Sequence, residues 1–184
     1  MPKARVDNLD VPYSVSRRRV RYPRLEFRTG KLVVVMPKGK SRAEEIINKH
    51  KAWIKQKKMA IGAALSQSKK RTLAKRNVLE LREMALKMVK EHGKRGFSIG
   101  RLFIRKMNSK WASHSRNRNL TLNSELRFLP KQLIEYVVFH EMVHSIERKH
   151  NERFWRLVER GFRNHQKMER ELMAYWFLIR SKLG

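Results

Sequence analysis

The stretch HEMVHSIERKH, from His140 to His150, predicts the helix around which the fold is built. It holds three of the seven histidines, at relative positions one, five and eleven, and a glutamate follows the first. Residues four apart lie on one face of an α-helix, so His140 and His144 project side by side and can reach one metal ion. Glu141 then points to the flank of that site, where a carboxylate suits a base acting on water.

A third metal ligand is needed, because a catalytic zinc takes three protein ligands and leaves one position for water. His150 is the natural third ligand, but it follows His144 by six residues, so the chain must leave the helix and turn back. Asn151 can then cap the next helix. His165 and Glu171 are alternative third ligands, and the alternative to any metal site is a charged helix whose histidines face solvent.

The surrounding pattern predicts short strands before this helix. Apolar residues alternate with polar ones around Leu102 and again around Leu120, with the basic loop KWASHSRNRN between the two strands. The helix is expected from Lys131, because Pro130 suits the start of a helix. Its apolar residues are expected to be buried: Leu133, Ile134, Val137, Val138 and Ile146.

The N-terminal third predicts strands followed by a helix. YPRLEFRTGKLVVVMPKG, residues 22–39, is typical of a β-hairpin that turns at Thr29-Gly30. A helix is expected after the capping-box pattern at residues 41–44, with an apolar stripe that fades near Gly62. The next helix is expected from about Leu73 to His92, after a basic stretch that is either a linker or its solvated start.

The composition limits the classes of partner. Lys+Arg total 45 against 16 Asp+Glu, a net charge of +29, and such a field attracts polyanions such as nucleic acid. With no cysteine, disulfides, thiolate ligands and a cysteine nucleophile are excluded. No apolar run approaches the roughly 18 residues of a membrane span, and the N-terminus lacks a secretory signal. We therefore expect a cytoplasmic protein with no membrane partner.

On these motifs the chain resembles the YgjP-like metallopeptidase family, relatives of the SprT-like and other HExxH zinc peptidases. The resemblance covers most of the chain and is carried by four stretches: VVVMPKG, HKAWIKQK, KWASHSRNRNLTLNSEL and YVVFHEMVHSIERKHNERFW. It implies an α+β fold with a zincin-like domain, in which a short antiparallel sheet packs on the HExxH helix. Residues 1–70 would form an N-terminal β-hairpin plus helix and residues 71–184 the metallopeptidase domain, packed as one compact unit.

The resemblance also implies a site and a reaction. His140, His144 and His150 would bind Zn2+, and Glu141 would be the general base in peptide-bond hydrolysis. The strand from Asn119 to Asn123 would bind an extended peptide or protein substrate by β-addition. The oligomeric state is left open.

Several residues near the motif depart from the family pattern or have two interpretations. Ala112 replaces a glycine and His114 a cysteine; His114 is either an exposed loop histidine or a group that approaches metal or substrate. Glu147 stands where metzincins have a turn glycine and is a candidate second-shell carboxylate. His114 and Tyr136 are candidate oxyanion stabilisers. Trp111 either anchors its loop or offers a stacking surface for a base.

Three functions are therefore compared. The first is a zinc-dependent metallopeptidase, acting near nucleic acid through its charge. The second is a zinc-dependent hydrolase of a nucleotide or other phosphate substrate. The third is a basic nucleic-acid-binding module with a structural or lost metal site. The candidate nucleic-acid contacts lie in basic runs and in the basic loop: Arg17, Arg18, Arg19, Lys69, Lys70, Arg71, Arg116 and Arg118.

Overall fold

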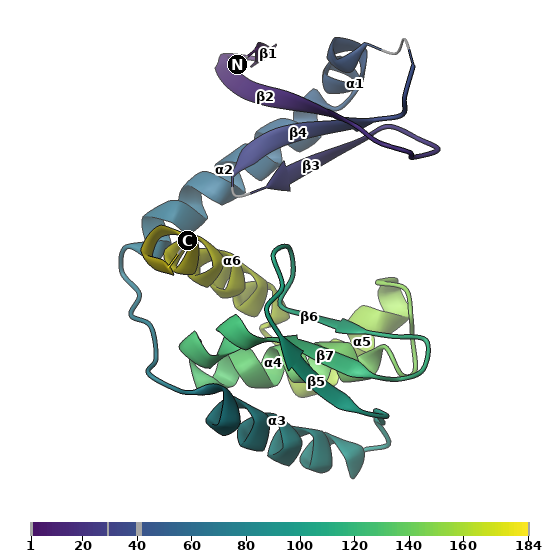
Figure 1. Ribbon diagram of the computed structural model, residues 1–184, viewed down its shortest axis with the longest axis vertical. Coiled ribbons are helices and arrows are strands. Elements are labelled where there is room, and N and C mark those ends of the chain that lie inside the picture. Colours follow the sequence, from purple (N-terminus) through teal and green to yellow (C-terminus); the bar gives the residue numbers. More distant parts are fainter. Residues whose placement is uncertain (1, 29, 40–41, 184) are drawn as a thin grey trace. The chain divides into compact units, whose positions relative to one another are not determined.

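The computed structural model describes residues 2–28, 30–39 and 42–183. It divides into two compact units, Met1–Lys69 and Lys70–Gly184, whose elements are labelled in Figure 1. Each unit has its own hydrophobic core. Among the described residues, no helix combines the length and apolar character needed to cross a bilayer. The architecture is α+β, as predicted.

The N-terminal unit is a four-stranded sheet with two helices. The strands are β1 (Lys3–Val6), β2 (Leu9–Arg17), β3 (Arg24–Arg28) and β4 (Lys31–Met36), in the order β1-β2-β4-β3. The β3–β4 hairpin confirms the prediction, and Gly30 takes the positive φ (80°) that a tight turn needs. Thr29, the other residue of the predicted turn, lies outside the described residues. Strand β2 pairs with β4 in parallel, so the hairpin forms one side of a larger sheet, with β3 at its edge.

Two helices follow where one was expected. They are α1 (Ala43–Lys49) and α2 (Lys51–Ser68), separated at His50. Ser41, the first residue of the predicted capping box, lies outside the described residues. Ile47 and Ile54 are fully buried with the apolar face of the sheet, which explains the apolar stripe in the sequence.

The C-terminal unit combines a three-stranded sheet with helices. Its elements are α3 (Val78–Gly93), β5 (Leu102–Arg105), β6 (Ala112–His114), β7 (Leu120–Asn123), the 3-10 helix η1 (Ser124–Phe128), α4 (Lys131–Val143), α5 (Glu152–Gly161) and α6 (His165–Leu183). The sheet order is β5-β7-β6. The sheet is mixed: β6 and β7 pair antiparallel, whereas β5 pairs with β7 in parallel. The expectation of an antiparallel sheet is therefore correct for β6 and β7 and wrong for β5.

Helix α3 begins five residues later than expected. The Asn77 side chain accepts a hydrogen bond from the Glu80 N–H (2.9 Å), and the Glu80 carboxylate accepts one from the Asn77 N–H (2.6 Å). This capping box fixes the start of the helix, so the apolar residues before it belong to an extended segment. In that segment the Ala74 N–H donates to the Phe128 carbonyl.

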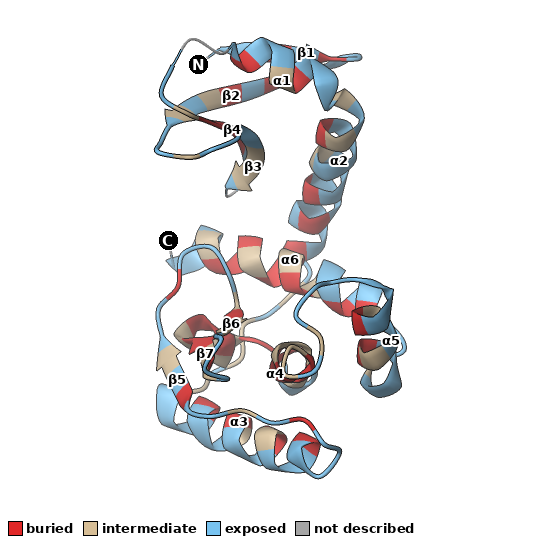
Figure 2. Ribbon diagram, turned by 90° about the vertical axis from the view of Figure 1, so that its right-hand side faces the viewer, coloured by how far each residue is buried: buried red, intermediate tan, exposed pale blue. Residues whose placement is uncertain are grey.

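Helix α4 is the centre of the C-terminal core. Figure 2 shows it as a largely buried helix, whereas α3 and α5 expose their outer faces. It packs against α3, α5, α6 and β6. Leu133, Ile134, Val137 and Val138 are buried as predicted, but Ile146 is exposed because the helix ends before it, at Val143.

Candidate metal centre

The last turn of α4 presents the first two histidines. His140 lies within the helix, and His144 is the residue that ends it, with φ −63° and ψ −12°. Because this backbone is still right-handed helical, the two side chains keep the one-turn spacing, and their ring centroids lie 5.4 Å apart.

The chain turns back immediately afterwards and delivers His150. The Ile146 and Glu147 N–H groups both donate to the Val143 carbonyl, so the helix closes in a tight turn. Glu147 does not have the positive φ that would call for a glycine. At the other end of the loop, the Asn151 side chain accepts from the Phe154 N–H (3.0 Å) and starts α5, as predicted.

The three imidazoles converge. One ring nitrogen from each of His140, His144 and His150 lies within 4.8 Å of the other two, and Nε2 of His140 is 3.1 Å from Nε2 of His150. A tetrahedral ion held at about 2.05 Å by each nitrogen would separate its ligand atoms by about 3.3 Å. The donor set and its spacing therefore fit a divalent metal.

The protonation of these rings also suits metal binding. Burial, followed by the neighbouring histidines, lowers the pKa of His140 to about 3. Burial likewise lowers the pKa of His144. Nδ1 of His144 lies 3.0 Å from the Glu147 carbonyl, which can only accept, so this nitrogen carries the proton and Nε2 keeps a lone pair. Glu147 thus contacts His144 through its carbonyl, while its carboxylate accepts from the Lys149 N–H (3.1 Å).

Glu141 directly follows His140 in α4 and is half-buried. Burial raises the pKa of its carboxyl to about 7, against the opposing effects of Lys110 and of a hydrogen bond from the His114 backbone. A carboxylate with a pKa near neutrality can both accept and release a proton. The same backbone contact places Glu141 next to strand β6.

Strand β6 lies in the stretch that we expected to be only a basic loop. It forms an edge of the sheet, whereas β7 is paired on both sides, by β5 and β6. The prediction that residues 119–123 receive a peptide strand is therefore wrong, because the backbone groups of a central strand are already paired. Sequence patterning missed β6 because three residues, Ala-Ser-His, show no strand periodicity.

The free edge of β6 faces Glu141. Trp111 and Ser115, which flank β6, bond to the β7 side with lengths of 2.8 and 2.9 Å. Since alternate residues of an antiparallel strand direct their backbone groups to opposite sides, Ala112 and His114 present theirs away from β7. The hydrogen bond from the His114 backbone to Glu141 agrees with this direction.

Two further residues fix this strand. The Trp111 ring packs edge-on against Trp176 of α6, with centroids 5.0 Å apart, which favours an anchoring role over a stacking surface for bases. Asn123 is fully buried, and its side-chain amide donates to the carbonyls of Met107 and Lys110 (2.8 and 3.0 Å). Asn123 was not singled out in the sequence, since its role depends on a loop 13 to 16 residues away.

The family assignment agrees with this geometry. The model of the YgjP-like metallopeptidase domain matches residues 73–175, more than half of the chain. The chain belongs to the YgjP-like metallopeptidases. A comparison with curated proteins gives no match.

Two solved metallopeptidase zymogens resemble this YgjP-like chain. Jannalysin of Methanocaldococcus jannaschii is 19% identical with a TM-score of 0.42, covering 50% of this chain and 87% of that one. Abylysin of Pyrococcus abyssi is 24% identical, also with a TM-score of 0.42, covering 53% of this chain and 92% of that one.

The remaining predicted residues of the YgjP-like chain lie elsewhere. The Glu171 carboxylate is held by Arg71 (2.6 and 2.8 Å), and His165 stacks on Trp155, so neither joins the three-histidine cluster. The Tyr136 hydroxyl donates to Glu169 (2.5 Å) and is not free to serve an oxyanion.

Five of the six candidate arginines are exposed but divided between the units, whereas the sixth, Arg71, is half-buried and bonded to Glu171. Arg17, Arg18 and Arg19 end β2 and follow it in the N-terminal unit, while Arg116 and Arg118 lie in the β6–β7 turn. The Arg17 guanidinium donates to the Gly39 carbonyl (2.5 Å), and Arg18 donates to the Ser16 hydroxyl (3.0 Å).

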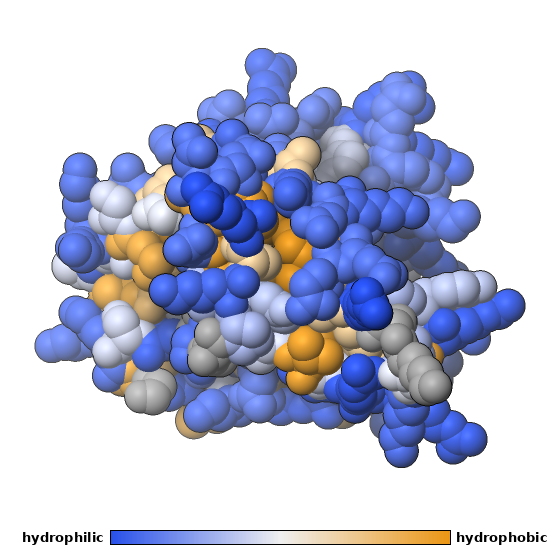
Figure 3. Space-filling model, turned by 90° about the horizontal axis from the view of Figure 1, so that it is seen from above, coloured by the Kyte–Doolittle hydropathy of each residue, from blue (hydrophilic) through white to orange (hydrophobic). Residues whose placement is uncertain are grey.

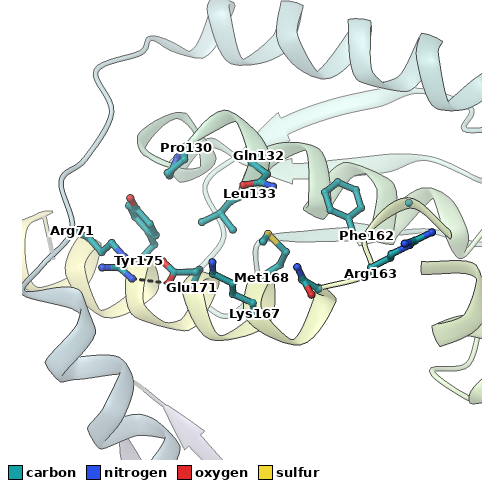
Figure 4. Close-up of a pocket in the computed structure, with 12 residues that line it drawn as sticks. Arg71, Pro130, Gln132, Leu133, Phe162, Arg163, Lys167, Met168, Glu171 and Tyr175 are labelled. Carbon is teal, nitrogen blue, oxygen red and sulfur yellow. Dashed lines mark hydrogen bonds and ion pairs between the residues drawn. The ribbon is translucent and has the colours of Figure 1, made fainter. Parts of the chain in front are cut away.

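A separate pocket of about 620 Å³ lies between the start of α4 and α6 (Figure 4). The Arg71–Glu171 ion pair forms part of its wall, together with Phe162, Arg163 and Lys167. None of the three clustered histidines lines it, so its polar groups are separate from the candidate metal centre.

Proposed function

We propose that this YgjP-like metallopeptidase uses zinc, held by His140, His144 and His150, with Glu141 as the general base. Membership of the family makes the chain a peptidase-type hydrolase that depends on a divalent metal. The observation that carries the finer assignment is the convergence of three imidazoles within 4.8 Å beside a half-buried glutamate. Nitrogen-only ligation suits zinc, whereas calcium and magnesium prefer oxygen ligands.

The mechanism divides between the ion and the chain. A bound zinc ion would polarise the scissile carbonyl and lower the pKa of the attacking water. Glu141 accepts the proton from that water and delivers it to the leaving amine, a transfer suited to a carboxyl with a pKa near 7. The carbonyl of Glu147 fixes the His144 ring throughout.

The substrate, in this proposal, pairs with the free edge of β6. An extended peptide would pair with the Ala112 backbone and the His114 carbonyl, which are directed away from β7; the His114 N–H bonds to Glu141, so this pairing would bring the scissile bond toward that carboxylate. We assign the His114 side chain to the substrate and not to the metal, because its Nε2 is buried with no partner among the described residues and it lies outside the histidine cluster.

The test is the Glu141→Gln variant, assayed on a peptide library with its zinc content measured. Loss of a proton acceptor should lower kcat by about 10²–10⁴-fold while zinc stays bound. His140→Ala, by contrast, should lose both zinc and activity. Full hydrolysis by a zinc-loaded Glu141→Gln protein would contradict the role of Glu141. Nucleotides assayed in parallel, with and without chelator, separate the phosphohydrolase alternative.

We also propose that the basic surface brings the enzyme to nucleic acid. The net charge is +29, and the face in Figure 3 is covered mostly by hydrophilic residues. Phosphate contacts make affinity fall steeply with salt, by roughly one logarithmic unit per contact for each tenfold rise in salt. A salt titration of RNA and DNA binding tests this, with an Arg17→Ala/Arg18→Ala/Arg19→Ala variant as the comparison. Binding that is weak at low salt and unchanged in the variant would contradict it.

A further inference from the structure

His140 has a second ring nitrogen whose partner the metal site does not supply. Its Nε2 faces His150, whereas its Nδ1 is buried and has no hydrogen-bond partner among the described residues. A histidine that binds a metal through one nitrogen carries a proton on the other, and that N–H needs an acceptor. Such an acceptor fixes the ring and makes it a better ligand.

Glu169 is the candidate acceptor for the Nδ1 proton of His140. Its Oε1 lies 3.9 Å from Nδ1 of His140. This distance is about 1 Å longer than a hydrogen bond, so a small movement of the side chain would form one. Glu169 belongs to α6, which packs against α4, so it approaches from outside the motif. The HExxH sequence gives no signal for it, because it lies 29 residues after His140.

Tyr136 holds that carboxylate in place. Its hydroxyl donates to the same Oε1 atom at 2.5 Å, and its ring is buried and meets the His140 ring edge-on at 5.9 Å. Tyr136 lies one helical turn before His140, so one face of α4 carries both the ligand and the group that aims the acceptor. The Glu169 side chain is 46% exposed, so this hydrogen bond, and not burial, fixes its carboxylate.

We propose that Glu169, oriented by Tyr136, is the positioning residue for His140: it accepts the Nδ1 proton of His140 and fixes Nε2 toward the metal. This rests on the proposed metal site and extends it to a residue of α6. Removal of such a partner lowers metal affinity about 10–100-fold in other metal sites.

The test is zinc affinity, measured by competition with a chromophoric chelator, for Glu169→Gln, Tyr136→Phe and the double variant. Glu171→Gln is the matched control, since its carboxylate lies on the same helix but binds Arg71. Glu169→Gln should weaken zinc binding 10–100-fold. Tyr136→Phe should weaken it less, and the double variant no more than Glu169→Gln alone, because the tyrosine acts through the carboxylate.

A second readout separates positioning from general destabilisation. In wild type loaded with zinc, ¹⁵N-resolved imidazole spectra should place the His140 proton on Nδ1 with a strong hydrogen bond, and Glu169→Gln should weaken that signature in a protein of unchanged fold. Unaltered zinc affinity in folded Glu169→Gln, or a loss equal to that of Glu171→Gln, would overturn the proposal. If wild type bound no zinc at all, the proposed metal site itself would fail.

Discussion

At the scale of single residues, Gly161 shows how closely the supporting helices approach the metal centre. A Cβ atom at this position would lie 2.5 Å from Cε1 of the Phe139 ring. Phe139 is buried and directly precedes His140 in α4. Any side chain at residue 161 would therefore push on the helical turn that carries His140, the first candidate metal ligand.

We predict that Gly161→Ala destabilises the C-terminal unit by about 1–3 kcal/mol, because the methyl group overlaps the Phe139 ring, which is buried and packed on all sides. Zinc affinity should fall with it, since the displaced Phe139 neighbours His140. The control is Gly62→Ala in α2, where a Cβ meets nothing within 4 Å and should be neutral or stabilising by up to about 1 kcal/mol. Denaturant unfolding monitors both, and equal effects in the two variants would contradict the packing argument.

The residues of the candidate metal centre differ in how far the sequence predicts them. His140 and His144 follow from local spacing, because a helical turn brings residues four apart together whatever the rest of the fold does. His150 lies beyond the end of α4 and joins them only because the loop before α5 turns back. Glu169 and Asn123 do not follow from local spacing, since their partners lie far away in the chain. Reasoning from periodicity finds ligands in a motif but not the groups that other elements bring to them.

At the scale of elements, the same distinction separates α4 from β6. Helix α4 has its own start signal in Pro130 and its own apolar pattern, and both predictions hold up to Val143, whereas Ile146 lies beyond the helix and is exposed. Strand β6 has no such signal and exists because β7 pairs with it. The start of α3 was predictable in principle from Asn77 and Glu80, but the apolar residues upstream of Asn77 suggested an earlier start.

We predict that backbone N-methylation of a good peptide substrate lowers kcat/KM at alternate positions. If the peptide pairs with β6 as a strand, only every second N–H is directed at the enzyme, and each lost hydrogen bond costs about 1 kcal/mol or roughly fivefold. A scan of single N-methyl substitutions over the residues flanking the scissile bond measures this. Tolerance at every position, or loss without a two-residue period, would argue against strand addition.

At the scale of the C-terminal unit as a whole, long-range ion pairs connect its beginning to its last helix. Arg71 reaches Glu171 with two hydrogen bonds across 100 residues, and Arg180 binds the buried Glu125 across 55. Both partners of each pair are at most about one-quarter exposed. These pairs tie α6, which also carries Glu169, to the rest of the unit.

The Arg71–Glu171 pair should make stability depend on pH. Hydrogen bonding from Arg71 lowers the pKa of Glu171 below its usual 4.5. A carboxyl whose pKa is lower in the folded state stabilises the fold above its unfolded pKa and loses that contribution as pH falls through the folded pKa. Arg71→Gln should thus cost about 1 kcal/mol at pH 7 and progressively less below pH 4.5. Unfolding titrations of both proteins from pH 7 to pH 3 check this; a gap that widens in acid would contradict it.

The shortness of β6 has a consequence for what the enzyme can cut. If a substrate pairs with β6 as proposed, three residues would contact only a short length of it, and they would contact main chain, which every protein possesses in the same form. Substrate selection would then depend less on side-chain identity than on whether a segment is locally unfolded. The backbone groups of a folded strand or helix are already hydrogen-bonded and cannot pair with β6. Folded proteins would then resist cleavage, and damaged or partly unfolded proteins would be cleaved.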